Sequence, residues 1–264
     1  MAGFLWLRQI CLVARVLAPV EAALGEVFRI NACYRENLFG GKFGLHNVIF
    51  PINGAFLEVI SLHPGVDPKN TPAGRYLERR KGDGGYMVIL ECNDVDRREK
   101  HMNTLGVRIV LHPKHDVFNE IQLHPSDTGG ALIAINETAG RQGFEGPYSP
   151  AGPEWWLKAT PSDLTSAILA AELQSPDPEA LAAKWGAVLE REVTSGIGGV
   201  PTILLEIGSL RFVPARDGRG EGLGGVDLAI TNRERVLKAA VACGLHTEND
   251  VVHICGTRFY LVQA

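Results

Sequence analysis

Glu58 is the residue whose type and position most strongly suggest chemistry in this chain. It stands in the apolar run AFLEVISL, directly after an Asn53-Gly54 pair that is typical of a hairpin turn. Burial disfavours an ionised carboxylate and raises its pKa, and a carboxyl group tuned toward neutrality can act as a general base. The sequence leaves three roles open for Glu58: metal ligand, proton-transferring base, or hydrogen-bonded partner in the core.

Pairing across this hairpin predicts the neighbours of Glu58. If the turn has two residues, Glu58 pairs with Ile49, and Asn47 is its diagonal neighbour on the same face. His46 then points to the other face, whereas a one-residue bulge would exchange the two side chains. We expect Asn47 to lie near Glu58, with His46 as the alternative.

Three further residues offer weaker signals. His124 precedes a proline at the end of a strand, in LHPSDTGG, where a structural role is favoured over a catalytic one. Arg79 and Arg80 lie in ERRKGDGG beside a glycine-rich bend. They are typical of a solvated charged face, or of a latch for a carboxylate or phosphate of a substrate. GDGG precedes its strand, so it does not indicate a nucleotide site.

The composition excludes several classes of function. The 264 residues carry a net charge of −4 with a pI near 6.1, which gives no electrostatic footprint for nucleic acid. No stretch approaches the roughly 20 apolar residues that span a bilayer. The five cysteines are scattered, which favours reduced thiols over a disulfide framework. We expect a cytoplasmic protein that binds neither nucleic acid nor membrane.

The chain repeats one pattern of strand, helix and three strands four times. The second unit begins at GGYMVILEC, the third at SAILAAEL and the fourth at GGVDLAIT. A segment dense in glycine and proline separates the two pairs of units, and Trp155 and Trp156 at its end are expected to pack between them. The predicted fold is therefore α+β, with a first unit pair at 1–140, a linker at 141–160 and a second pair at 161–264. The expected strands of the first pair are 7–14, 45–52, 55–61, 85–91, 119–124 and 130–136.

Paired βαβββ units resemble the vicinal oxygen chelate superfamily, which includes glyoxalase, methylmalonyl-CoA epimerase, extradiol dioxygenases and bleomycin-resistance proteins. The local likeness lies in RQICLVA, FLEVIS and LHPSDTGGALIAI. The resemblance implies that each pair of modules forms one curled, barrel-like mixed sheet around a cavity. It also implies a small-molecule substrate or ligand, and it is compatible with a homodimer.

The metal of this superfamily is held by the first and last strands of each paired unit. The resemblance places Gln9 and Glu58 at two of these positions, and Met87 and Ala134 at the other two. Methionine and alanine do not suit a divalent ion that prefers imidazole or carboxylate ligands. We therefore expect no metal cofactor, with a displaced site at His46, Glu58 and His124 as the alternative.

The resemblance also places the ligand cavity in the first barrel, while Phe212 and Tyr260 are expected to fill the second. The residues expected to line the first cavity are Gln9, Cys11, Asn47, Glu58, Met87 and Ala134.

The function hypothesis is a metal-independent proton-transfer enzyme of the isomerase or lyase type, with Glu58 as base and His46 and His124 as further catalytic candidates. The alternative is a protein that sequesters a small molecule without turnover, as bleomycin-resistance proteins do. A metal-dependent lyase or a ring-cleaving dioxygenase ranks last. The dioxygenase needs two histidines and a carboxylate on iron, and the corresponding positions of this chain do not hold that set of residues. Fold alone does not decide among these functions.

Overall fold

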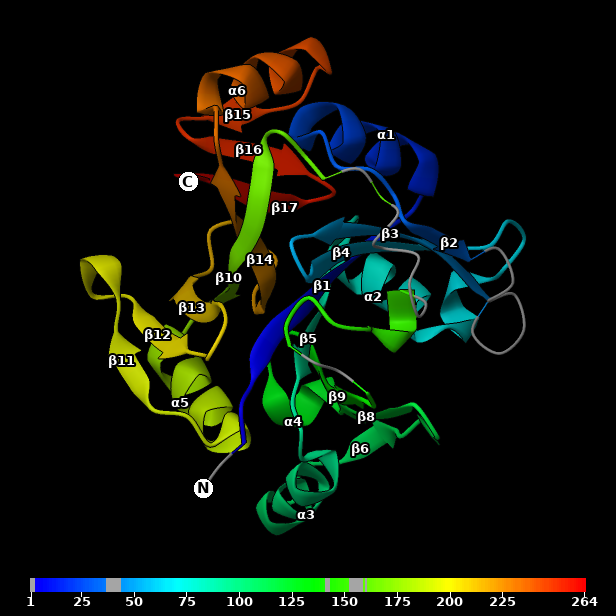
Figure 1. Ribbon diagram of the computed structural model, residues 1–264, viewed down its shortest axis with the longest axis vertical. Helices are drawn as coiled ribbons and strands as arrows, with labels where there is room; N and C mark the ends of the chain where they lie inside the picture. The colour runs from blue at the N-terminus through cyan, green and yellow to red at the C-terminus, as the bar shows by residue number, and fades with distance from the viewer. Residues whose placement is uncertain (1–2, 37–43, 141–142, 152–158, 160) are drawn as a thin grey trace.

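The computed structural model describes residues 3–36, 44–140, 143–151, 159 and 161–264, and it contains the fourfold repeat (Figure 1). The first module comprises β1 (Trp6–Ala14), α1 (Leu17–Phe28), β2 (Tyr34–Glu36), β3 (Leu45–Ile52) and β4 (Ala55–Leu62). The second comprises β5 (Gly84–Glu91), α3 (Val95–Leu105), β6 (Ile109–Leu111), β7 (Lys114–His115), β8 (Phe118–Leu123), α4 (Pro125–Thr128) and β9 (Leu132–Thr138).

The second half repeats this order. The third module comprises β10 (Thr165–Ser175), α5 (Pro178–Leu189), β11 (Val193–Ser195), β12 (Pro201–Leu204) and β13 (Ser209–Pro214). The fourth comprises β14 (Gly222–Ile230), α6 (Arg233–Ala242), β15 (Thr247–Glu248), β16 (Val251–Ile254) and β17 (Thr257–Gln263). The predicted α+β architecture of four βαβββ modules is confirmed.

Strand pairing follows the same scheme in each half. In the first half β1 runs parallel to β4 and antiparallel to β5, and β5 runs parallel to β9. In the second half β10 pairs with β13 and β14, and β14 pairs with β17. The halves meet where Leu223 of β14 pairs with Gly85 of β5, so the strands form one large mixed sheet. Each half is curled but does not close into a barrel.

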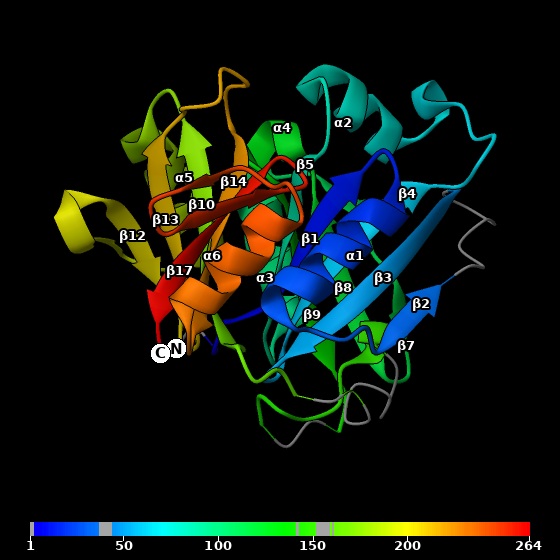
Figure 2. The ribbon, with the colours of Figure 1, turned by 90° about the horizontal axis from the view of Figure 1, so that it is seen from above.

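One apolar core joins the two halves. It contains residues of the first half, such as Leu12 and Leu90, together with Leu173 and Phe259 of the second. Phe28 of α1 lies 5.1 Å from Phe259 between ring centroids. Figures 1 and 2 show α1 beside α6, which come from opposite ends of the chain. The strands of the first and second halves of this large sheet are called the first and the second sheet below. Their helix-bearing faces are therefore buried together.

The division of the chain at 141–160 stays a prediction, and Trp155 and Trp156 lie outside the described residues.

The face of the first sheet that carries Gln9, Asn47 and Glu58, here called the Glu58 face, lies on the side away from this core. Part of it is covered by α2 (Pro72–Arg80), a helix that the sequence analysis did not predict. Ala73, Tyr76 and Leu77 of α2 pack with Cys11, Val13 and Met87.

Two local signals in the sequence account for α2. Thr71 caps the helix by accepting a hydrogen bond from Gly74 N, and Pro72 occupies the first turn. Arg80 at its end is buried, and its guanidinium donates to the carbonyls of Arg219 and Glu221 at 2.8 Å. Arg80 therefore fastens α2 to the second half, and the prediction of a substrate latch is corrected at this residue.

Among the described residues, no helix combines the length and the apolar character needed to cross a membrane.

Candidate active site

The hairpin of β3 and β4 positions Glu58 as predicted. Asn53 and Gly54 have φ values of 47° and 84°, the left-handed conformation that a tight hairpin turn requires. Ile52 pairs with Ala55, so the turn has two residues, and Glu58 pairs with Ile49. Asn47 therefore points to the same face as Glu58.

Two amide groups hold the Glu58 carboxylate. Asn47 Nδ2 donates to Oε1 at 2.6 Å, and Gln9 Nε2 of the neighbouring strand donates to Oε2 at 2.7 Å. Protein atoms surround the carboxylate, although Glu58 keeps partial contact with solvent. Burial raises the pKa of Glu58, and the hydrogen bonds from Asn47, Cys11 and Gln9 oppose that rise. No arginine or lysine of the described residues forms an ion pair with it, so it lacks a cationic partner there.

A second carboxylate, Glu120 of β8, lies on the same face and was missed in the sequence analysis. It is 6% exposed, and Gln122 Nε2 donates to it at 2.8 Å. Burial raises the pKa of Glu120 to about 7, and the charge of Glu58 adds to that rise, against hydrogen bonds from Gln122 and Asn136. The signal was present in the strand, where Glu120 and Gln122 alternate with buried Ile121 and Leu123.

Two amide oxygens on this face have no hydrogen-bond partner within the described part of the chain. They are Gln9 Oε1 and Asn136 Oδ1, and both are buried. Buried polar atoms in folded proteins are nearly always paired. A bound molecule that carries hydrogen-bond donors could therefore complete this face.

A buried ion pair closes one end of the Glu58 face. Arg8 Nε lies 3.0 Å from Glu91 Oε2, and both side chains are fully buried. The guanidinium lies 4.9 Å from the ring centroid of Tyr148 and 5.2 Å from that of Phe56. Tyr148 stacks on Phe56 with centroids 4.7 Å apart. The charge of Arg8 is therefore matched locally by Glu91.

The donors on this face do not fit the metal that the fold family implies. Gln9 and Glu58 are hydrogen-bonded to each other, and Met87 and Ala134 belong to an apolar cluster with Ile89. Met87 and Ala134 therefore offer neither imidazole nor carboxylate to a divalent ion at two of the four positions that the fold family uses.

The histidines of the displaced-site hypothesis do not gather at Glu58. His46 lies on the opposite face of β3, where its ring stacks on His63 with centroids 4.9 Å apart. His124 caps α4, and its Nδ1 accepts a hydrogen bond from Ser126 N at 3.1 Å. The structure therefore assigns His46 to another surface and His124 to helix capping, and it corrects their grouping with Glu58.

A cavity of about 690 Å³ lies beside the Glu58 face and not at Glu58 itself. The predicted lining of Gln9, Asn47 and Glu58 does not border it. Arg79 also stands apart from Glu58, with its guanidinium 5.4 Å from the centroid of Tyr76. The polar and titratable residues that line the cavity are Arg15, Glu21, His46, Ser61, His63 and Glu78.

The corresponding face of the second sheet, here called the Arg258 face, is filled by charged side chains. Arg258 lies 2.7 Å from Glu172, which also lies 3.1 Å from Arg211. Tyr260 donates its hydroxyl to Glu172 at 3.1 Å. Arg211 in turn donates to Asp227 at 2.8 Å. These ion pairs occupy the space in which the first sheet carries its two carboxylates.

Phe212 does not fill this face, contrary to the prediction. It is buried in the shared core, with its ring centroid 5.9 Å from that of Trp185 of α5. The connection between β12 and β13 spans the four residues 205–208, two more than the Asn53-Gly54 turn between β3 and β4. The shift exchanges the faces, so Arg211 points where Phe212 was expected.

Solved structures are similar to the whole chain, although no family model and no curated protein match it. A hypothetical protein from Staphylococcus aureus aligns over 98% of this chain and 99% of its own, with a TM-score of 0.67 and 12% identity. The Mn(II)-bound glyoxalase from Novosphingobium aromaticivorans aligns over 99% of this chain and 82% of its own, with a TM-score of 0.63 and 11% identity. The chain has the vicinal oxygen chelate fold.

A third structure agrees with this assignment. A mutant of 4-hydroxymandelate synthase from Streptomyces coelicolor aligns over 93% of this chain and 76% of its own, with a TM-score of 0.62 and 11% identity. The resemblance seen in the sequence is confirmed for the fold. At these identities the likeness concerns architecture, so the chemistry has to be argued from the residues of the chain itself.

Replacing Glu120 with glutamine is expected to stabilise the protein at pH 8. The folded-state pKa of Glu120, about 7, lies above its ordinary value of 4.5, so the fold favours the neutral, protonated carboxyl group. Glu120 therefore contributes most to stability at low pH, whereas glutamine stays neutral at every pH. This stability is lost as the pH rises through 7. Glu120→Gln should therefore raise the free energy of unfolding at pH 8 by up to about 3 kcal/mol, and by less at pH 5. Urea unfolding at both pH values measures this, and equal stability of the two proteins at pH 8 would contradict it.

Proposed function

We propose that this chain is a metal-independent enzyme that moves a proton on a small organic molecule bound at the Glu58 face. The observation that carries the proposal is the state of Glu58: a carboxylate with raised pKa, held by two amides and lacking a cationic partner among the described residues. Titratable groups perturbed in this way concentrate at functional sites.

Glu58 is the proposed base. It is fixed on two sides by Gln9 and Asn47, and it keeps the partial exposure that a substrate needs in order to reach it. The amides orient the carboxylate without adding a charge that would lower its basicity. A base whose pKa approaches the working pH combines the correct protonation state with the strongest drive for proton transfer.

Glu120 is the proposed proton donor. With a pKa of about 7, close to half of the Glu120 carboxyl groups are protonated at neutral pH. Because the charge of Glu58 contributes to that value, ionisation of one group favours protonation of the other. Two carboxyl groups in different states can take a proton and return one, which is what an isomerase requires.

The substrate class follows from the polar groups on the face. Two carboxylates disfavour an anion at their centre, whereas the oxygens of Gln9 and Asn136 lack donors among the described residues. A neutral molecule with a carbonyl group, an acidic C–H bond beside it and a hydroxyl or amide donor would satisfy these groups. Binding of such a molecule without turnover is the alternative that the experiment must separate.

Solvent deuterium exchange tests the proposal. Protein dialysed against EDTA is incubated in D₂O with a panel of hydroxy ketones, amides of oxo acids and acyl thioesters, and proton NMR follows the acidic C–H signal. The proposal expects protein-dependent loss of that signal for at least one compound. Binding that shifts the ligand resonances without any exchange would instead support a sequestering protein.

A further inference from the structure

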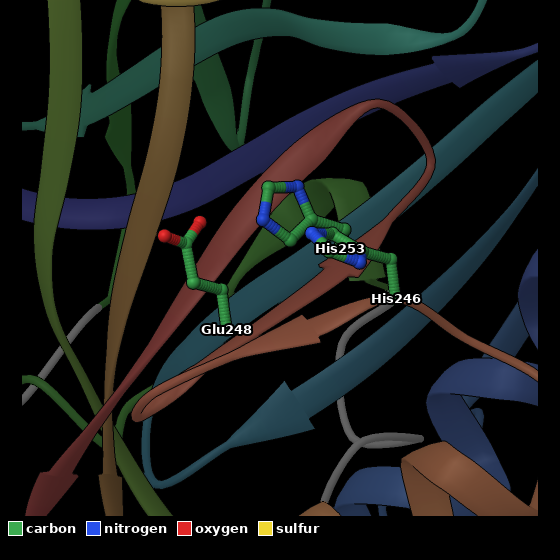
Figure 3. Close-up of side chains that lie close together, drawn as sticks. All are labelled: His246, Glu248 and His253. Atoms are coloured by element: carbon green, nitrogen blue, oxygen red, sulfur yellow. The ribbon is translucent and has the colours of Figure 1, made fainter.

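The hairpin of β15 and β16 carries three side chains that suit a transition-metal ion. They are His246, Glu248 and His253, and their ligand atoms all lie within 4.8 Å of one another. Figure 3 shows the three side chains gathered on this hairpin. Within the described residues this is the one such group of three or more histidine, cysteine or acidic side chains, and it lies far from Glu58 in the chain.

The backbone fixes the relative positions of the donors. His246 and Glu248 are two residues apart, so they project from the same face of the strand, and His253 N donates to His246 O at 3.0 Å across the hairpin. The hairpin tip is tied to α6 by the ion pair of Arg233 and Asp250. The backbone hydrogen bond and the ion pair therefore hold together the two arms of the hairpin that carry the three donors.

The spacing requires only a small adjustment. In a tetrahedral site with Zn–N distances near 2.0–2.1 Å, neighbouring ligand atoms lie about 3.4 Å apart. The present spread of 4.8 Å can contract to this value by side-chain rotation, because His246 and Glu248 are exposed. The imidazole rings of His246 and His253 lie close together and tilted, with centroids 4.8 Å apart and planes inclined by 48°.

The electrostatic surroundings permit a cation. A metal ion binds imidazole in its neutral form, and Glu248 contributes a negative charge beside the two imidazole rings. Arg258 is the cation of the adjacent strand, since it pairs with His253 across β16 and β17. Its charge is matched by Glu172 at 2.7 Å, so it does not stand uncompensated beside the hairpin.

We propose that His246, Glu248 and His253 bind one zinc-class divalent ion, with the remaining coordination position open to water. Two imidazoles and one carboxylate are the ligand set of zinc sites that keep an exchangeable position. The donors come from the middle strands of the fourth module, whereas the fold family uses the first and last strands. The site is also separate from the Glu58 face, so its presence or failure leaves the proposed proton transfer untouched.

Calorimetric titration of the EDTA-dialysed full-length protein with Zn²⁺ at pH 7.5 tests the site. One equivalent should bind to the unaltered protein. Loss of a group that only orients a metal ligand costs about 10–100-fold in metal affinity, and loss of a ligand itself should cost at least as much. We therefore expect zinc affinity to fall at least about tenfold in each of three variants: His246→Ala, His253→Ala and Glu248→Gln. Circular dichroism of each variant confirms that it folds.

Two controls separate this site from other zinc-binding groups. Cys243→Ser removes an exposed thiol three residues before His246, and His46→Ala removes one ring of the stacked pair formed by His46 and His63. Both should bind Zn²⁺ with the affinity of the unaltered protein. Visible absorption of the Co²⁺ form gives a second readout, with the tetrahedral bands lost in His253→Ala. Unchanged zinc affinity in folded His246→Ala and His253→Ala, or absence of stoichiometric binding, would overturn the proposal.

Discussion

Glu58→Gln is expected to lower the rate of solvent deuterium incorporation by about 100-fold or more, while the protein stays folded and still binds the ligand. Glutamine retains the shape of the side chain, and its one amide oxygen can accept the hydrogen bond from Asn47. Its NH2 group can donate to Gln9 Oε1, which is unpaired within the described residues, if the amide of Gln9 turns over. Glutamine cannot take up a proton at neutral pH. The rate should therefore fall without a comparable fall in ligand affinity, which NMR titration measures on the same samples.

A matched control keeps this result interpretable. Glu234→Gln makes the same chemical change at an exposed position in the first turn of α6, and its exchange rate should equal that of the unaltered protein. If Glu58 only stabilises the core, Glu58→Gln should retain its turnover. A well-folded Glu58→Gln protein with an undiminished rate would end the proton-transfer hypothesis and leave a binding protein in its place.

Arg8→Met is expected to lower the free energy of unfolding by about 3–5 kcal/mol at pH 7. Arg8 and Glu91 are both fully buried, and their ion pair spans 3.0 Å at one end of the Glu58 face. Removing the guanidinium deprives the fully buried Glu91 carboxylate of the positive charge of Arg8. Arg8 also donates to Gly146 O at 2.9 Å, a hydrogen bond that methionine cannot replace.

Chemical unfolding of two further variants tests this prediction. Arg8→Met combined with Glu91→Gln should recover much of the lost stability, because the uncompensated charge is removed. Arg108→Met breaks an ion pair with Asp127 in which the arginine is largely exposed, and it should cost at most about 1 kcal/mol. A loss in Arg8→Met no larger than in Arg108→Met would show that the buried pair does not contribute as described.

The sequence predicted the first-half strands because their signals are local. Alternating apolar residues and an Asn-Gly turn specify a hairpin within a few residues, and the register follows from the turn length. That register placed Asn47 beside Glu58, and the hydrogen bond of 2.6 Å confirms it. The repeat gave the order of modules for the same reason, since each module carries its own pattern.

Features set by loop length and by distant contacts were not predicted. Between the strands expected at 119–124 and 130–136, the chain forms the short helix α4, which His124 caps. The longer connection before β13 moved Phe212 to the core and Arg211 to the opposite face. Neither change leaves a trace in the strand patterns themselves, because a slip of one residue preserves the alternation and exchanges the faces.

The pKa of Glu120 was beyond prediction for a different reason. The alternation in β8 shows that Glu120 shares a face with Gln122, but not which residues surround that face. Its burial depends on the packing of the whole first half. Its coupling to Glu58 is an electrostatic interaction between residues that lie 62 positions apart in the chain. Only the assembled sheet places the two carboxylates on one face.

The most direct measurement is the titration of the glutamate side chains by NMR, using protein labelled with ¹³C at the side-chain carboxyl group. We expect one resonance that titrates near pH 7, is absent from Glu120→Gln, and moves to a lower pKa in Glu58→Gln, because the charge of Glu58 raises the pKa of Glu120. If every glutamate titrates at its ordinary pKa of 4.5, independently of its neighbours, the Glu58 face holds no tuned carboxylate pair and the proposed function is wrong.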